Sequence, residues 1–185
     1  MSDKKDKNER RGRRSYLEDF RRSASGEYIY AGAYFSRKGG YSRREHLLRL
    51  WLAGAVLIAA AVARGCIPVA GMAGGSLHSI YVLIPYICEL ICAVSVVWAL
   101  VRLSANAEPL REYVYNATAA ILPLRSAFAA AFAAAAFIGE AVFFAIHGPE
   151  GLPLIALPAI ACAAALIVRR YSRLQEWEKT SGGNN

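Results

Sequence analysis

Residues 126–147 read SAFAAAFAAAAFIGEAVFFAIH, and no other segment says as much about how the chain folds. The stretch contains one acidic residue, Glu140, and is otherwise apolar between Ser126 and His147. An α-helix rises 1.5 Å per residue, so about 20 such residues cross a hydrocarbon core about 30 Å thick. The stretch therefore predicts a transmembrane helix with a carboxylate inside the membrane.

The composition supports a membrane-embedded body. Of the 185 residues, 56% are hydrophobic and 19% are charged, whereas a soluble domain is roughly 45–50% apolar and about 25% charged. Three further apolar segments also have the length of a span. We predict an all-α integral membrane protein, a bundle of four transmembrane helices. Its transmembrane domain covers residues 43–171, with spans at about 43–64, 79–103, 122–147 and 152–171.

The positions of the basic residues predict the orientation. Residues 1–46 hold 13 of the 22 Lys and Arg but 7 of the 14 Asp and Glu, a net charge of +6. The turn after the second span and the C-terminal tail are also basic, whereas the turns at 66–78 and 148–151 contain no Lys or Arg. Because basic flanks stay in the cytoplasm, both termini are predicted to be cytoplasmic, in a protein of the cell membrane.

The hydrophilic N-terminal region divides into two segments. Residues 1–26 have too few apolar anchors to offset the entropy of ordering, which predicts a disordered basic arm without a nucleic-acid-binding motif. Residues 27–42 mix aromatic and basic side chains beside the first span, a pattern that suits the headgroup layer. We expect contacts with the bilayer, and with its anionic inner-leaflet lipids, from Tyr28, Tyr30, Tyr34, Arg37, Lys38, Arg43 and Arg44.

Local signals mark several boundaries. Ser42 followed by Glu45 has the spacing of a capping box, which predicts that the first helix begins beside it. The segment 106–115, NAEPLREYVY, predicts a short interfacial helix with Asn106 as its cap and Pro109 in its first turn. In the cytoplasmic tail, 172–185, the fourth helix is expected to continue briefly, to about Lys179, and residues 182–185 are expected to fray.

Two carboxylates lie inside predicted spans, Glu89 in the second and Glu140 in the third. A charge at the centre of a span costs about 2.5–3.5 kcal/mol on insertion scales, so each acid needs a partner, a proton or water. Helical spacing puts Glu140 on one seam of small residues, which lets helices approach closely and indicates the bundle-facing side. The seam consists of Ser126, Ala129, Ala133, Ala136, Glu140, Phe143 and His147.

These acids are expected to meet other polar residues in the outer half of the bundle. Arg64 ends the first span, and His78 and His147 lie at the outer ends of the second and third. We expect Arg64, His78 and His147 to converge with Glu89 and Glu140. One interpretation is a buried Glu–Arg pair plus one protonated Glu that serves assembly or packing, with both histidines marking the water boundary. Another is a polar vestibule for a proton, a cation or an amine. Metal binding is the weakest, because no close ligand spacing occurs, so no metal or cofactor is predicted.

The cysteines and motifs give little sign of catalysis. Cys88 and Cys92, one turn apart, do not have ordinary disulfide geometry, and Cys66 with Cys88 is the one pair considered for a bridge. Quinone-linked thiol oxidoreductases resemble the chain in number of spans, but their Cys-x-x-Cys pair is absent. Small multidrug exporters are similar in span count, yet carry their acid on the first span of a shorter chain. With no catalytic motif present, no enzyme is predicted, and thiol redox activity is the alternative.

The predicted function is that of a non-enzymatic accessory or assembly subunit of a larger membrane complex. The missing catalytic motifs, the small-residue seam and the long arm favour it, and the expected partner is another membrane protein or a second copy of the chain. The alternative is a small transporter or ion-coupled carrier, in which Glu89 and Glu140 are protonatable sites of an outward-facing vestibule.

Overall fold

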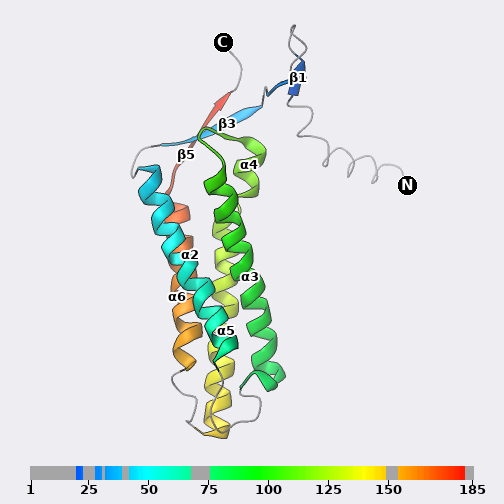
Figure 1. Ribbon diagram of the computed structural model, residues 1–185, viewed down its shortest axis with the longest axis vertical. Coiled ribbons are helices and arrows are strands. Elements are labelled where there is room, and N and C mark those ends of the chain that lie inside the picture. Colours follow the sequence, from blue (N-terminus) through cyan, green and yellow to red (C-terminus); the bar gives the residue numbers. More distant parts are fainter. Residues whose placement is uncertain are drawn as a thin grey trace, which may run out of the picture.

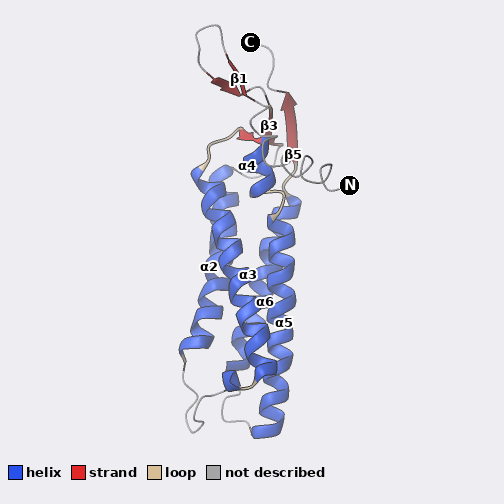
Figure 2. Cartoon of the chain, turned by 90° about the vertical axis from the view of Figure 1, so that its right-hand side faces the viewer, coloured by secondary structure: helices blue, strands red, loops and turns tan. Residues whose placement is uncertain are grey.

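Four long helices dominate the computed structural model, which describes residues 20–22, 28–30, 32–38, 42–67, 76–148 and 154–181. The helices run side by side along the long axis (Figures 1 and 2). The prediction of a mostly helical chain is confirmed, and each helix begins and ends within four residues of a predicted span. They are α2 (Arg43–Cys66), α3 (Ile80–Ala105), α5 (Leu122–His147) and α6 (Ala156–Leu174).

Within the described ranges, three segments are long and apolar enough to cross a membrane: Arg43–Cys66, Ile80–Ala105 and Glu112–His147. The last contains α5 and the short helix α4 (Glu112–Ala117). α6 differs because three arginines lie in its last turns, which leaves an apolar part, 156–168, of about 20 Å at helical rise. The fourth span therefore stays a prediction.

The four helices pack as a ring. α2 contacts α3, α3 contacts α5, α5 contacts α6, and α6 returns to α2. The interior is rich in alanine, because small side chains let helix backbones approach closely. Large apolar side chains cover the outer faces instead, as a lipid-facing surface requires; among the most exposed are Leu52, Ile84, Ile91, Trp98, Phe128 and Ile138.

The predicted seam of α5 faces this interior. Each seam residue from Ser126 to Phe143 is buried, as predicted, but the last member, His147, is exposed. The backbone of α3 comes close to α5 beside the seam, where a Cβ added to Gly139 would lie 2.9 Å from the carbonyl oxygen of Tyr81. Glycine is therefore required at this crossing.

A small β-sheet covers one end of the helices, and an all-α fold class does not include it. β3 (Ala33–Arg37) lies between β4 (Leu110–Arg111) and β5 (Trp177–Ser181), and both neighbours are antiparallel to it. We call this the sheet end and the opposite end the far end. The prediction missed the sheet because its strands come from distant segments, and strand pairing is not visible in local periodicity.

The strands correct three local predictions. The fourth helix was expected to continue to about Lys179, but α6 ends at Leu174 and Trp177–Ser181 pairs with β3; the fraying expected at 182–185 lies outside the described residues. The interfacial helix begins at Glu112 rather than near Asn106, because Leu110–Arg111 joins the sheet. Phe20–Arg22 of the arm (β1) pairs with Tyr28–Tyr30 of the following segment (β2), while the disorder expected at 1–19 and 23–26 lies outside the described residues.

The capping box is confirmed at the start of α2. The Ser42 hydroxyl accepts a hydrogen bond from the Glu45 backbone N–H at 3.3 Å, and the Glu45 carboxylate accepts one from the Ser42 N–H at 3.3 Å. Two otherwise unpaired donors are satisfied in this way. The cap fixes where α2 leaves the sheet end.

Candidate functional site

Three charged side chains from three helices meet in the far half of the ring. Arg64 in the last turn of α2 donates from Nε to Glu140 Oε1 at 2.6 Å and from Nη1 to Glu89 Oε2 at 3.1 Å. The exposed fractions of the three side chains are 0–1%. We call Arg64, Glu89 and Glu140 the ion triad. The structure brings these three residues together, as the sequence predicts.

The ion triad links helices that are not neighbours in the ring. Glu140 lies on α5, which is opposite α2, so the Arg64 side chain crosses the interior to reach it. Two further groups contact the ion triad, one at Glu140 and one at Arg64. Ser76 in the 3₁₀-helix η1 (Ser76–His78) donates to Glu140 Oε1 at 3.5 Å, and the Arg64 guanidinium lies 5.1 Å from the ring centre of Tyr86, a cation–π distance.

The charges of the ion triad do not balance. Two carboxylates share one guanidinium, so the group has one excess negative charge when both acids are ionised. Among the described residues, Arg64 Nη2, Glu89 Oε1 and Glu140 Oε2 are buried without a hydrogen-bond partner, and leaving such atoms unpaired is costly. A proton on one carboxyl group would bring the net charge to zero.

The histidines do not belong to the ion triad. His78 is exposed in η1, and His147 is exposed at the end of α5, where its Nδ1 lies 3.1 Å from the Phe143 carbonyl and its ring stacks on Phe143. Exposed positions at the ends of their helices are what the ion-pair interpretation expects of residues at the water boundary, and a part for either histidine in a polar vestibule stays a prediction. The described segments contain no cluster of three or more His, Cys, Asp or Glu side chains arranged to hold a metal ion.

Sequence reasoning missed two residues that contact the ion triad, Tyr86 on α3 and Ser76. Ser76 lies in the connection between α2 and α3, where no periodic pattern relates it to Glu140. The cysteines are all free thiols: Cys66 is exposed, and Cys88, Cys92 and Cys162 are half-buried. A Cys66–Cys88 bridge is therefore not formed in this structure.

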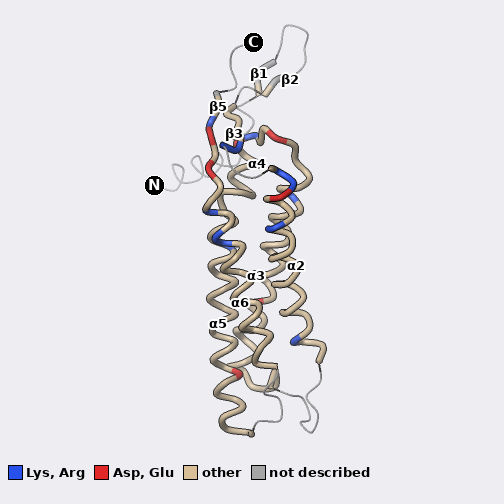
Figure 3. Tube along the Cα trace, turned by 90° about the vertical axis from the view of Figure 1, so that its left-hand side faces the viewer, with Lys and Arg blue, Asp and Glu red and all other residues tan. Residues whose placement is uncertain are grey.

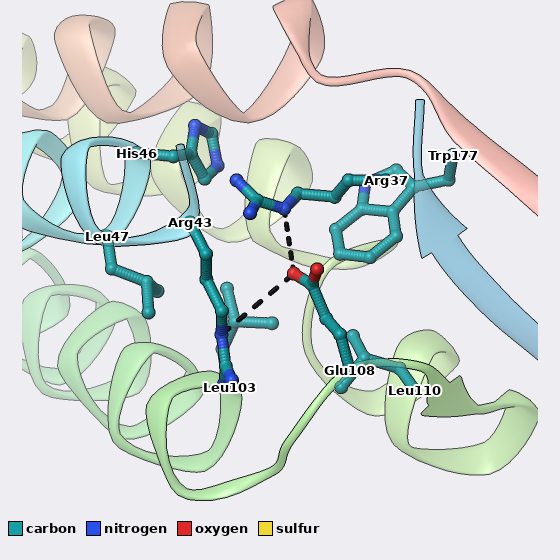
Figure 4. Close-up of a pocket in the computed structure, with 8 residues that line it drawn as sticks. All are labelled: Arg37, Arg43, His46, Leu47, Leu103, Glu108, Leu110 and Trp177. Carbon is teal, nitrogen blue, oxygen red and sulfur yellow. Dashed lines mark hydrogen bonds and ion pairs between the residues drawn. The ribbon is translucent and has the colours of Figure 1, made fainter. Parts of the chain in front are cut away.

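A second group of charges lies at the sheet end. Arg37 on β3 donates from Nε to Glu108 Oε1 at 2.7 Å, and Arg43 Nε lies 3.9 Å from the same oxygen. Arg43 also donates to the backbone carbonyl of Asn106. A small pocket surrounds these groups, and Figure 4 shows Glu108 between the two arginines. We call it the Arg37 pocket; it is lined by Arg37, Arg43, His46, Leu47, Leu103, Glu108, Leu110 and Trp177.

The residues predicted to contact the inner leaflet differ in how exposed they are in the structure. Arg37 has a side chain only 10% exposed, and Tyr30 is buried against the rings of Phe20 and Tyr34. By contrast, Lys38 and Arg44 are exposed, Tyr34 and Arg43 are intermediate, and Tyr28 lies in β2. Lipid contact by the exposed members stays a prediction, whereas Tyr30 and Arg37 are covered by the chain itself.

The comparisons with known proteins give no relative. The chain matches no protein-family model, and neither a curated protein nor a solved structure shows significant similarity to it.

Proposed function

We propose that the chain is an integral protein of the cell membrane with four spans and both termini in the cytoplasm. α6 would supply the fourth span, because it packs between α5 and α2 as part of the same ring. The arginines in its last turns would lie in the headgroup layer, which long basic side chains reach readily.

The sheet end supports this topology. β3 precedes the first helix of the ring, β5 follows the last, and the two strands pair. The chain thus enters and leaves the ring at one end, as an even number of spans requires. Charged residues gather at this end (Figure 3), and the basic excess in the sequence favours its placement in the cytoplasm.

Within that topology, we propose that the protein is a non-enzymatic accessory or assembly subunit of a larger membrane complex. The observation that carries this function is the closed ion triad. A ligand from solution must reach the groups that bind it, but the three side chains are at most 1% exposed and are paired with one another. Their charges therefore serve to hold α2, α3 and α5 in one arrangement.

The fixed arrangement would present the apolar outer faces to a partner. The partner is another membrane protein or a second copy of the chain, because the exposed residues of the helices are aliphatic and aromatic. Small residues in the interior let the helices pack closely into a rigid body, and the large apolar side chains on its outer surface can pack against a partner within the lipid.

Site-specific photocrosslinking in native membranes tests the accessory role. A photoreactive residue is placed at one exposed position on each long helix, and we expect a discrete heavier protein adduct from one or two of the four positions. The buried position Ala93 is the matched control and should give none. Lipid adducts alone at all four exposed positions would contradict the proposal. The positions are Leu52, Ile91, Ile138 and Leu166.

The second candidate is a proton-coupled carrier, and the excess carboxylate of the ion triad favours it. Flux driven by a pH gradient across proteoliposomes separates the two functions. A carrier loses flux in both Glu89→Gln and Glu140→Gln but keeps it in Glu178→Gln, which neutralises an exposed acid on β5. The accessory function predicts no gradient-driven flux in the wild-type protein.

A further inference from the structure

Arg37 has an unsatisfied donor in the Arg37 pocket. Its side chain is nine-tenths buried, and its Nε donates to Glu108 Oε1 at 2.7 Å. Nη1 is buried and has no hydrogen-bond partner among the described residues. A buried donor without a partner loses its hydration without compensation, so this position favours an acceptor from outside the chain.

The charge of the pocket specifies what kind of acceptor fits. Two guanidinium groups, of Arg37 and Arg43, face one carboxylate, of Glu108, which leaves one excess positive charge. His46, 6% exposed, also lines the pocket, and the described residues contribute no second acid to the lining. An anionic oxygen would therefore balance the charge and satisfy Nη1 together.

The shape of the pocket limits how far a ligand enters. It has room for about one water-sized group. Its remaining walls are the apolar side chains of Leu47, Leu103 and Leu110 and the indole of Trp177. One oxygen of a larger group can enter while the rest stays at the mouth. Phosphate suits such entry, because its oxygens accept charge-assisted hydrogen bonds from guanidinium groups.

We propose that the Arg37 pocket is a binding site for a phosphate group, either the headgroup of an anionic lipid or a free phosphate. The pocket lies where α2 begins, between the helices and the sheet (Figure 4). In the proposed topology this is the membrane boundary, so the lipid source rests on that topology, whereas the anion site itself does not.

Binding to the full-length chain in neutral detergent tests the proposal. The probes are dioctanoyl phosphatidic acid, dioctanoylglycerol with the same tails but no phosphate, and inorganic phosphate without tails. Trp177 lines the pocket and reports binding through its fluorescence, and Trp177→Phe identifies its share of the signal. We expect saturable binding of phosphatidic acid and none of dioctanoylglycerol.

Two variants with opposite expected effects distinguish a specific binding site from a general attraction of the anionic probe to positive charge on the protein. Arg37→Gln should weaken binding at least about tenfold, whereas Lys38→Gln removes the same charge from an exposed neighbour and should change it less than about twofold. Glu108→Gln removes the competing carboxylate and should tighten binding at least about threefold. Its control is Glu178→Gln, which should leave affinity unchanged.

The outcomes are distinct. Competition by inorganic phosphate at similar concentration supports the site with free phosphate as its ligand, and binding of phosphatidic acid alone supports a lipid headgroup. Equal losses in Arg37→Gln and Lys38→Gln, equal effects of Glu108→Gln and Glu178→Gln, or no binding of either phosphate probe would overturn it. If Arg37→Gln does not fold, the Glu108→Gln comparison still decides. Failure here would leave the crosslinking result untouched.

Discussion

The two ends of the helix ring contain the same kinds of charged residue in opposite proportion. In the far half, two carboxylates share one guanidinium; at the sheet end, two guanidinium groups share one carboxylate. The side chains of the ion triad are at most 1% exposed, whereas those of Arg37, Glu108 and Arg43 range from 10% to 33%. The degree of burial therefore distinguishes the ion triad, which is closed to solution, from the sheet-end group, which a ligand could reach.

The reason lies in what surrounds each group. The ion triad is enclosed by α2, α3 and α5, so its acids depend on Arg64 and Ser76 for their polar contacts. The sheet-end group lies where a strand, a turn and a helix start come together, and these elements leave a pocket between them. Packed helices exclude water more completely than such a junction does.

The largest effect is expected from a substitution of Arg64 in the ion triad. Arg64→Met leaves two carboxylates buried without a counter-charge, and removing one partner of a buried pair costs about 3–5 kcal/mol. We expect a loss of about 3 kcal/mol or more in the free energy of unfolding, measured by reversible denaturation in mixed micelles.

A combined variant provides the control for that loss. Arg64→Met together with Glu89→Gln and Glu140→Gln removes every charge of the ion triad, so most of the lost stability should return. If the single and the combined variants are equally destabilised, the effect comes from side-chain packing and not from the uncompensated acids.

Glu108 tests the sheet end with a smaller expected effect. Glu108→Leu removes the shared partner of Arg37 and Arg43, but both arginines keep some access to water, so we expect a loss of about 1 kcal/mol. Faster amide hydrogen exchange in β3, with unchanged exchange in α5, would show that the loss of stability is confined to the sheet end. Glu178→Leu on exposed β5 is the control. A loss as large as that of Arg64→Met would remove the proposed difference between the ends.

The smallest effect is expected at the exposed pair of Lys179 and Glu112. Their nitrogen and oxygen lie 3.6 Å apart, with side chains 60% and 37% exposed, so solvent screens the attraction. Lys179→Gln should change the unfolding free energy by less than about 0.5 kcal/mol. A change above about 1 kcal/mol would show that burial is not what ranks these ion pairs.

Local patterns were enough to predict the helices. The apolar lengths, the Ser42–Glu45 capping box and the seam on α5 all depend on residues within a few turns of each other, and the structure shows the helices, the cap and a buried seam as far as Phe143. His147 departs from the seam because the helix runs past its neighbours at that point. Periodicity says which face is buried but not where the burial stops.

Apolar runs, basic flanks and intramembrane acids are properties of the sequence alone, and they determined the helical class and singled out Arg64, Glu89 and Glu140. Only the tertiary structure decided that one guanidinium binds both acids, that Ser76 joins them, and that Arg37 pairs with Glu108, 71 residues away. Helix formation is set by neighbours along the chain, whereas partner choice among buried charges depends on which segments packing brings within hydrogen-bond distance.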